Sequence, residues 1–251
     1  MFSNNFFYFF SLVTDGFSSR FNLYALTRVA SIDIMVGLAM MVVILTGGLN
    51  LSLGALGVSA AMFGGWCMQS LGIPIIPSVL LILLFGTFLG WINGYVTVKT
   101  GVHSFIVTLA TMSIYFGFMT VLTEAQSFKY LPDAFTDIGS MKLFYKYVSP
   151  LLLFSLFIGC VLFYLFNFTD IGRKLIAAGA NPSAAELSGI SVNRMFVYCH
   201  MLSGFLAAVA GIMVTMRIGA AIPSIAGHLG FDWLLPAFLA PVLGGTLLSG
   251  G

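Results

Sequence analysis

The chain has 251 residues, of which 59% are apolar and 7% are charged, and its mean hydropathy is +1.05. A soluble domain carries about 25% charged residues, so this composition excludes a water-soluble enzyme, a nucleic-acid-binding domain and a secreted disulfide scaffold. The net charge of +2 gives no sign of a polyanionic partner. The sequence therefore predicts an integral membrane protein.

Long runs without a charged residue divide the chain into candidate membrane spans. A helix needs about 20 apolar residues to cross the hydrocarbon core, and the chain lacks the alternating pattern of a membrane barrel. We therefore expect an all-α polytopic bundle of about seven or eight spans, forming a single membrane domain over residues 1–251. The expected spans are 24–46, 51–68, 74–98, 103–123, 148–168, 195–216 and 231–248, with a shorter apolar stretch at 4–14.

The first break between spans is the glycine-rich segment TGGLNLSLG at 46–54. Non-helical backbone at membrane depth is tolerated where it is buried in protein or lines a cavity, and transporters often place binding sites at such breaks. Gly47, Gly48, Asn50 and Ser52 are therefore candidates for a translocation pathway, because neutral hydrogen-bonding groups suit a sugar hydroxyl. A plain turn between two helices is the alternative.

Polar side chains inside the spans are further pathway candidates. Asp33 lies well inside an apolar stretch, where a charge is costly enough to suggest function, although an interfacial position or a partner on another span would also explain it. Arg28 is five positions away and poorly placed to pair with it on one helix face. Thr108 and Thr111 are placed to line a hydrophilic path, although hydroxyl side chains in spans more often bond their own helix backbone.

Two spans carry small residues at every fourth position, the pattern that allows helices to pack closely in lipid. The two stripes are Gly86, Gly90 and Gly94, and Ser203, Ala207 and Gly211. We expect tight helix packing from both.

The connection 171–194 contains a strong signal for a short helix. Asn181 suits the N-cap, Pro182 suits the first helical position and Gly189 suits the left-handed residue past the end. Ser183 and Glu186 offer an alternative capping box. A helix of about two turns is not stable alone in water, so we expect it to dock either on the rest of the membrane domain or on another protein.

Several segments of the chain together resemble one family. GRKLIAAGANPSAAELSGI resembles the cytoplasmic loop of the ABC-type simple-sugar permeases, the ribose, xylose and autoinducer-2 class of bacterial importers. The resemblance covers nearly the whole chain from about Asn22. It extends to ILTGGLNLSLGAL (44–56), GWINGYVTVKTGVHSFIVTLATMSIYFGF (90–118), LSGFLAAVAGIMVTMRIGAAIPSIAG (202–227) and LGGTLLSGG (243–251).

The resemblance implies a subunit of the bacterial inner membrane that forms a sugar pathway with a second permease copy, as a homodimer or a heterodimer. A periplasmic or surface solute-binding protein would deliver the small sugar-like substrate, and a cytoplasmic ABC ATPase would supply the energy. Membrane lipid would surround the spans. By the same resemblance, the loop that couples to the ATPase comprises Gly172, Arg173, Gly179, Asn181, Pro182, Ala184, Ala185, Ser188 and Gly189.

The chain carries no nucleotide-binding motif, so we expect no enzyme activity, no cofactor and no metal site in it, with ATP bound by the partner subunit. Asn50 stands where the family commonly has Asp, so a charge-dependent role is not transferred to it. The family normally continues for about two further spans beyond the glycine motif at 243–251, which this chain is expected to lack. Two alternatives to an importer subunit therefore stay open: a truncated or non-transporting membrane assembly subunit, and a stand-alone secondary carrier or channel.

An internal similarity adds two pathway candidates. GGLNLSLG (47–54) and GGTLLSGG (244–251) share the pattern G-G-x-x-L-S-x-G, which adds Gly244 and Gly245 and predicts two breaks at comparable membrane depths. With 169–194 on the cytoplasmic side, four Lys and Arg residues are inside and six outside, so the positive-inside rule does not support this orientation. The resemblance places 169–194 in the cytoplasm, so 124–147 is expected at the opposite membrane surface.

Overall fold

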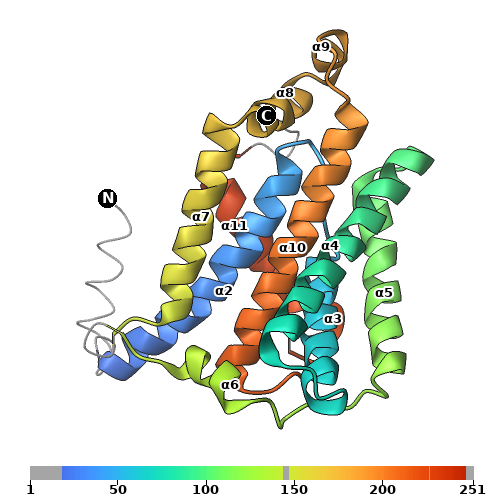
Figure 1. The fold of residues 1–251 in the computed structure, drawn as a ribbon. Helices are drawn as coiled ribbons and strands as arrows, with labels where there is room; N and C mark the ends of the chain where they lie inside the picture. Colours follow the sequence, from blue (N-terminus) through green and yellow to red (C-terminus); the bar gives the residue numbers. More distant parts are fainter. Residues whose placement is uncertain (1–18, 144–146, 226, 247–251) are drawn as a thin grey trace.

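The computed structural model describes residues 19–143, 147–225 and 227–246, and within these ranges the regular elements are all helical (Figure 1). Five helices of the described chain are long and apolar enough to cross a membrane. They are α2 (Arg20–Ile44), α4 (Ile75–Thr100), α5 (Ser104–Leu122), α7 (Pro150–Phe168) and α10 (Val192–Ile218). The prediction of an all-α membrane bundle is confirmed. The predicted stretch 4–14 lies outside the described residues.

The two remaining predicted spans are interrupted helices. α3 (Leu53–Gly65) continues into one π-helical turn, η1 (Trp66–Ser70), and a 3₁₀ turn, η3 (His228–Trp233), leads into the short α11 (Leu234–Leu243). The helix predicted to start at 51 starts at Leu53, because Asn50 Oδ1 accepts a hydrogen bond from the Ser52 backbone N–H at 3.2 Å and so holds a turn before the helix.

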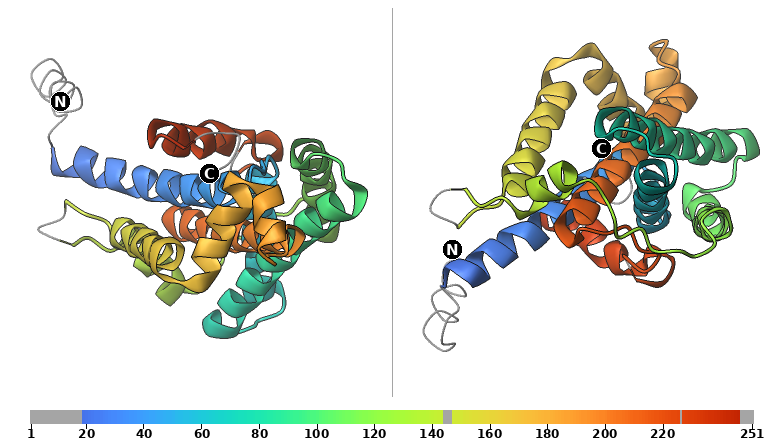
Figure 2. Two further views of the ribbon diagram at one scale, coloured as in Figure 1. Left: turned by 90° about the horizontal axis from the view of Figure 1, so that it is seen from above. Right: turned by 60° about the horizontal axis from the view of Figure 1, so that its bottom comes forward.

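α10 is the central helix of the bundle. Of the residues in its most apolar 18-residue stretch, 72% are buried, against 22% for the same measure in α7. In both views of Figure 2, α4 and α5 lie on one side of α10 and α7 lies on the other. A Cβ atom added to Gly90 would overlap the carbonyl oxygen of His200, which shows how closely the backbones of α4 and α10 approach. The expected tight packing of this glycine stripe is therefore confirmed.

The stripe of small residues on α10 that faces α4 is shifted by one position from the stripe Ser203, Ala207 and Gly211 identified in the sequence. Gly204 and Ala208 face the glycines of α4, whereas Gly211 packs against the backbone of Gly57 in α3, and Ser203 hydrogen-bonds with the helix break. Because α10 is buried on several sides, more than one face of it carries small residues. Spacing alone did not indicate which face meets α4.

The two ends of the bundle carry different short helices. α8 (Asp170–Ala180) and α9 (Pro182–Leu187) lie at one end, and α6 (Asp133–Ser140) lies at the other (Figure 1). The segments 124–143 and 169–191 are thus at opposite ends of the spanning helices, as the sequence predicts.

Candidate translocation site and coupling segment

The helix break between α2 and α3 is held inside the protein by hydroxyl groups of α5. Ser104 Oγ accepts from the Leu49 backbone N–H at 2.8 Å, and Thr108 Oγ1 accepts from the Leu51 N–H at 3.1 Å. Gly48 is buried, and a Cβ there would lie 2.9 Å from Val43 Cγ1. These side chains replace the backbone partners that an unbroken helix would supply, as membrane depth requires.

Side chains of the break begin a chain of buried hydrogen bonds. Asn50 donates through Nδ2 to Ser203 Oγ of α10 at 3.0 Å, and Asn50 Oδ1 accepts from the Ser52 hydroxyl at 2.7 Å. Ser52 Oγ in turn accepts from Asn93 Nδ2 of α4 at 2.8 Å. The break is thereby linked to two of the spanning helices.

Asn93 is the junction of this hydrogen-bond chain. Its Oδ1 accepts from Thr111 Oγ1 at 2.7 Å and from the Tyr115 hydroxyl at 2.8 Å, both on α5. We call the resulting set the Asn50–Asn93 network. Its members are Asn50, Ser52, Asn93, Thr111, Tyr115 and Ser203.

The network carries no charge, its polar side chains are hydrogen-bonded to one another, and it is closed to solvent. Each of its side chains is 7% exposed or less, so in this conformation solvent does not reach it. Amide and hydroxyl groups both donate and accept hydrogen bonds, which is the chemistry that a polyhydroxylated solute offers in return. Buried polar networks of this kind also fix the relative positions of helices.

A buried histidine lies next to the network on α10, one turn before Ser203. His200 Nδ1 is 3.1 Å from the Phe196 carbonyl oxygen, and the two rings lie 4.5 Å apart. His200 Nε2 is buried without a hydrogen-bond partner among the described residues. Phe196 in turn borders Gly48 of the break.

The structure brings most of the pathway candidates together and separates the others. Gly47, Gly48, Asn50, Ser52, Thr108 and Thr111 all lie at or against the helix break. Asp33 lies elsewhere on α2, half-buried and within electrostatic reach of Arg217 at the end of α10. Arg28 donates to the Arg217 carbonyl oxygen rather than pairing with Asp33.

Gly244 and Gly245 are exposed past the end of α11, whereas Asn50 and Ser52 are fully buried. Residues 247–251 of the second glycine motif lie outside the described residues. The expected equivalence of the two breaks therefore stays a prediction.

Asn93 and Ser203 are network members that the sequence analysis did not select as pathway candidates. Asn93 lies between Gly90 and Gly94 in an otherwise apolar span, and a primary amide there was a detectable signal, since such a group in lipid must find partners. Ser203 was selected only as a small packing residue. Its hydroxyl instead accepts from Asn50.

The coupling segment begins with α8, whose first turn is capped and charged. Thr169 Oγ1 accepts from the Gly172 N–H at 3.1 Å, and Asp170 pairs with Lys174 at 2.6 Å and with Arg173 at 3.7 Å. The Lys174 ammonium donates to the Asp170 carboxylate and holds its pKa below the usual value. A Cβ on Gly179 would overlap the Leu45 carbonyl oxygen, so α8 is packed tightly onto the end of α2.

α9 has the capping that its sequence predicts. Asn181 Oδ1 accepts from the Ala184 N–H at 3.0 Å, Pro182 occupies the first turn and Gly189 has a φ of 80°. Asn181, not Ser183, is therefore the N-cap. One face of α9 is buried at Ala185, and Leu187 on the outer side is 92% exposed.

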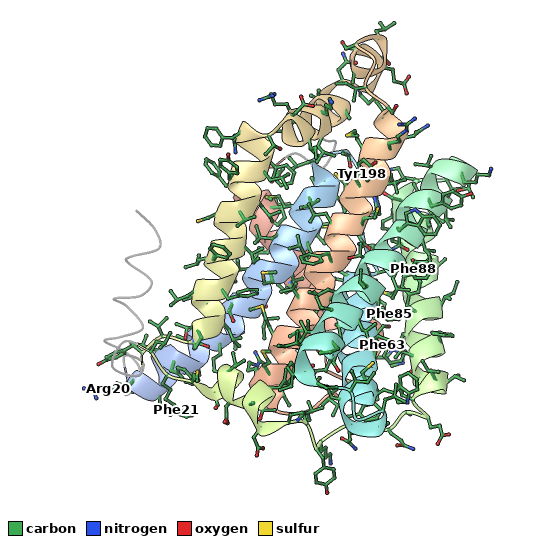
Figure 3. The ribbon with its side chains drawn as sticks, in the orientation of Figure 1. Arg20, Phe21, Phe63, Phe85, Phe88 and Tyr198 are labelled. Carbon is green, nitrogen blue, oxygen red and sulfur yellow. The ribbon has the colours of Figure 1, made fainter. Side chains whose placement is uncertain are left out.

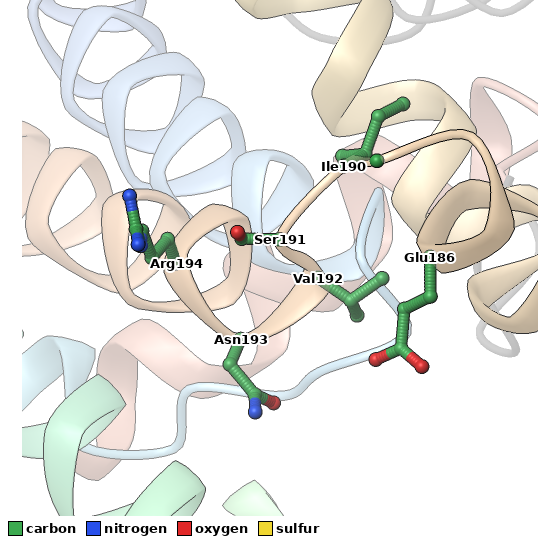
Figure 4. A pocket seen from close by; sticks show the side chains of 7 residues that line it. Glu186, Ile190, Ser191, Val192, Asn193 and Arg194 are labelled. Atoms are coloured by element: carbon green, nitrogen blue, oxygen red, sulfur yellow. The ribbon is translucent and has the colours of Figure 1, made fainter.

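A polar groove separates α9 from the start of α10. It has a volume of about 510 Å³ and is lined by Glu186 and by 189–194. The side chains of Glu186 and Arg194 point in different directions (Figure 4), and no ion pair between them is present. The groove and the exposed outer face of α9 together form an open surface at this end of the molecule.

Comparison with known proteins places the whole chain in one group. The family described as "Branched-chain amino acid transport system / permease component" matches residues 22–250. The chain is 35% identical to the ribose import permease protein RbsC of Haemophilus influenzae, an alignment that covers 96% of this chain and 74% of that protein. No solved structure matches.

Two further relatives carry different substrate names. The D-allose transport system permease protein AlsC of Escherichia coli is 31% identical, with 96% of this chain and 72% of that protein covered. The autoinducer 2 import system permease protein LsrD of Salmonella paratyphi B is 31% identical, with 86% and 65% covered. The chain is therefore a multi-pass membrane protein that belongs to the family of bacterial transport-system permease components, within its ABC-type simple-sugar group.

Proposed function

We propose that the chain is the inner-membrane permease subunit of an ATP-driven importer for a monosaccharide or a similar small polyhydroxylated solute. A separate cytoplasmic ATPase binds and hydrolyses ATP, a periplasmic or surface binding protein delivers the solute, and a second permease copy completes the pathway. The relatives' names carry the substrate class: ribose, allose and autoinducer 2 are the solutes in them.

The observation that carries the coupling assignment is the exposure of α9 at the end of the bundle opposite 124–143. Its N-cap and its left-handed end residue are both formed within the chain, and Ala185 packs one face of it onto the bundle. Ala184 and Leu187 are exposed on it. A short rigid helix of this kind fits a shallow cleft on another protein and transmits a rigid-body movement.

α8 connects this surface to the transmembrane helices. Gly172 packs against the backbone of α7 at Leu165 and Phe166, and Gly179 packs against the end of α2, beside the helix break. A displacement of α9 by the ATPase would therefore move α8, and α8 would press on both α7 and the segment that leads to Asn50. Because packed elements of this kind respond as rigid bodies, the Asn50–Asn93 network is the group of contacts that such a movement would open to a solute.

Ala184→Glu tests the coupling assignment. The side chain is exposed, so the variant should insert and fold normally while its added carboxylate blocks the docking face. We expect loss of ribose or allose uptake, and loss of a co-purifying ATPase, in cells of the source organism that express the variant in place of wild type.

Val102→Glu is the matched control, because Val102 is 40% exposed in the α4–α5 connection at the same end of the bundle, outside α9. It should leave ATPase retention unchanged. Normal uptake by Ala184→Glu with the ATPase still bound would contradict the assignment. The absence of any neighbouring ATPase gene would count against the importer itself.

A further inference from the structure

An apolar slot opens on the outer face of α10, between α4 and α7. Tyr198, Met201, Leu202 and Phe205 form its floor, in one stripe along α10, and the slot has a volume of about 470 Å³. This volume falls within the roughly 300–1,000 Å³ of small-molecule sites. The walls come from Thr87 of α4, Leu165 of α7, and Ile171 and Leu175 of α8.

The slot is open towards lipid rather than filled by the bundle. Tyr198 is 49% exposed and Ile171 is 57% exposed although both border it, and Figure 3 shows Tyr198 at the end of α10 that α8 overhangs. Thr87 Oγ1 donates to its own helix at Leu83 O, at 2.7 Å. The slot therefore presents almost only carbon to a ligand, as the interior of a bilayer does.

Two basic residues lie beyond the Tyr198 end of the slot, outside its lining, and one of them, Arg194, also borders the polar groove next to α9. Arg194 lies one turn before Tyr198 on the same stripe of α10, is exposed, and has no ion pair with another residue in the described part of the chain. Lys174, on α8 next to Leu175, already forms an ion pair with Asp170. A free guanidinium, a tyrosine hydroxyl and an apolar slot follow one another along one helix face in the order of a phospholipid's headgroup, interface and chain.

We propose that this slot binds an acyl chain of an anionic phospholipid whose headgroup pairs with Arg194. In this proposal the acyl chain lies beneath α8, along Tyr198, Met201, Leu202 and Phe205. A second copy is the other occupant that would cover this apolar surface. Its Asp170 at this end is already paired with Lys174 and Arg173, and the dimer measurement below distinguishes it from the lipid. The exposed Arg194 next to an apolar slot favours an anionic lipid. The ligand would brace α8 against α4 and α10 where the slot lies between Thr87 of α4 and Leu165 of α7.

Native mass spectrometry of the delipidated protein, titrated with phosphatidylglycerol and with phosphatidylcholine of identical acyl chains, tests the proposal. We expect wild type to prefer phosphatidylglycerol by about fivefold, the effect of one basic side chain near a membrane surface. Arg194→Gln should abolish the preference. Lys129→Gln, which removes an exposed cation at the opposite end, should retain it.

Leu202→Trp should fill the slot and weaken binding of both lipids. Thr87→Phe fills it from the opposite wall and serves if the first variant does not fold. Equal binding of the two lipids by wild type, an unchanged preference in Arg194→Gln, or undiminished binding by both slot-filling variants would overturn the proposal. So would a dimer that Leu202→Trp dissociates without any loss of lipid, because a second copy would then occupy the slot.

Discussion

Two segments that each contain Asn, Ser, Gly and Leu lie between the spanning helices, and they differ in burial and in the groups that their polar side chains bond. The break at 45–52 lies inside the bundle, where Asn50 and Ser52 are fully buried and hydrogen-bonded to α4 and α10. The segment 181–189 also contains Asn, Ser, Gly and Leu, with Ala, Pro and Glu in addition, yet nearly all of it is exposed and its hydrogen bonds are internal. Asn50 uses its side chain to join helices, whereas Asn181 uses its side chain to shape one.

The comparison teaches that the surroundings decide what such a segment does. α5 and α10 present hydroxyls to the first break, so its polar groups are satisfied without water. The second segment projects beyond the helix ends. Changes around the first should therefore reduce the stability of the protein, and changes in the second should alter association with a partner while stability is kept.

The largest expected effect is on the α4–α10 contact that encloses the buried break. Gly90→Leu places a side chain against the His200 carbonyl oxygen and, at 3.1 Å, against Gly204 Cα. Overpacking of this kind should lower the free energy of unfolding by about 3 kcal/mol or more. Thermal unfolding in detergent measures it.

Gly117→Leu is the control, because a Cβ at Gly117 of α5 meets nothing within 4 Å. It should unfold at the wild-type temperature. Equal stability of the two variants would show that α4 and α10 are not in backbone contact.

Removal of the network junction should have the next largest effect. Asn93→Leu removes the shared partner of Ser52, Thr111 and Tyr115, each of which keeps one other hydrogen bond, to Asn50, Thr108 and Leu89 respectively. Each lost buried hydrogen bond costs about 0.5–1.5 kcal/mol, so the variant should be destabilised by about 1–3 kcal/mol. Urea or thermal unfolding of the purified protein would detect the loss. Asn167→Leu makes the same change at an exposed position where the amide bonds only its own helix at Phe163 O, and should be nearly neutral. Similar stabilities for the two variants would show that the Asn50–Asn93 network does not stabilise the fold.

The exposed segment should respond in the opposite way. Leu187→Asp should change the free energy of unfolding by less than about 0.5 kcal/mol, as is usual for surface substitutions, because Leu187 is 92% exposed. The affinity of the variant for the ATPase should nevertheless fall at least about tenfold. This corresponds to the loss of about 1.4 kcal/mol of binding free energy from one apolar contact at the interface. Tyr130→Asp, at an 86% exposed position at the other end, should leave that affinity unchanged. A destabilised Leu187→Asp would mean that Leu187 packs on the bundle and does not face outward.

The smallest effect concerns the charges of α8. The pKa of Asp170 lies below its usual value of 3.8 because Lys174 donates to the carboxylate. A lowered folded-state pKa means that the pair stabilises the fold above the unfolded pKa, and that this contribution disappears as the pH falls through the folded value. Asp170→Asn should therefore lower the unfolding temperature slightly at neutral pH. The difference from wild type should shrink as the pH falls below 3.8 and vanish once the pH is below the folded-state pKa of Asp170. A difference that grows in acid would contradict this prediction.

The long helices and the α9 caps could be predicted from sequence because their signals are local. Runs without charge located 75–100, 104–122 and 150–168 to within two residues, and Asn181, Pro182 and Gly189 occupy the predicted cap positions. The end of α11 was harder to predict from the sequence. The apolar pattern extends to 248, but the helix ends at Leu243, and Gly245, with a φ of 88°, allows the chain to turn.

The network depends on contacts between segments distant in sequence, which no local pattern encodes. Asn93 and Ser203 lie 43 and 153 residues from Asn50. Their partners become evident only when α4, α5 and α10 surround the break. Asp33 illustrates the same limit: the nearest cation in sequence is Arg28, but the one that acts on it electrostatically is Arg217 at the end of another helix.

Labelling of single cysteines in a variant without Cys67, Cys160 and Cys199 tests the central claim most directly. We expect a membrane-impermeant maleimide to label Leu187→Cys in inside-out vesicles, to label Tyr130→Cys only in intact spheroplasts, and to be blocked from Leu187→Cys by bound ATPase. Labelling of both positions from one side, or labelling of Leu187→Cys that the ATPase does not slow, would contradict the assignment of α9 as the cytoplasmic docking helix.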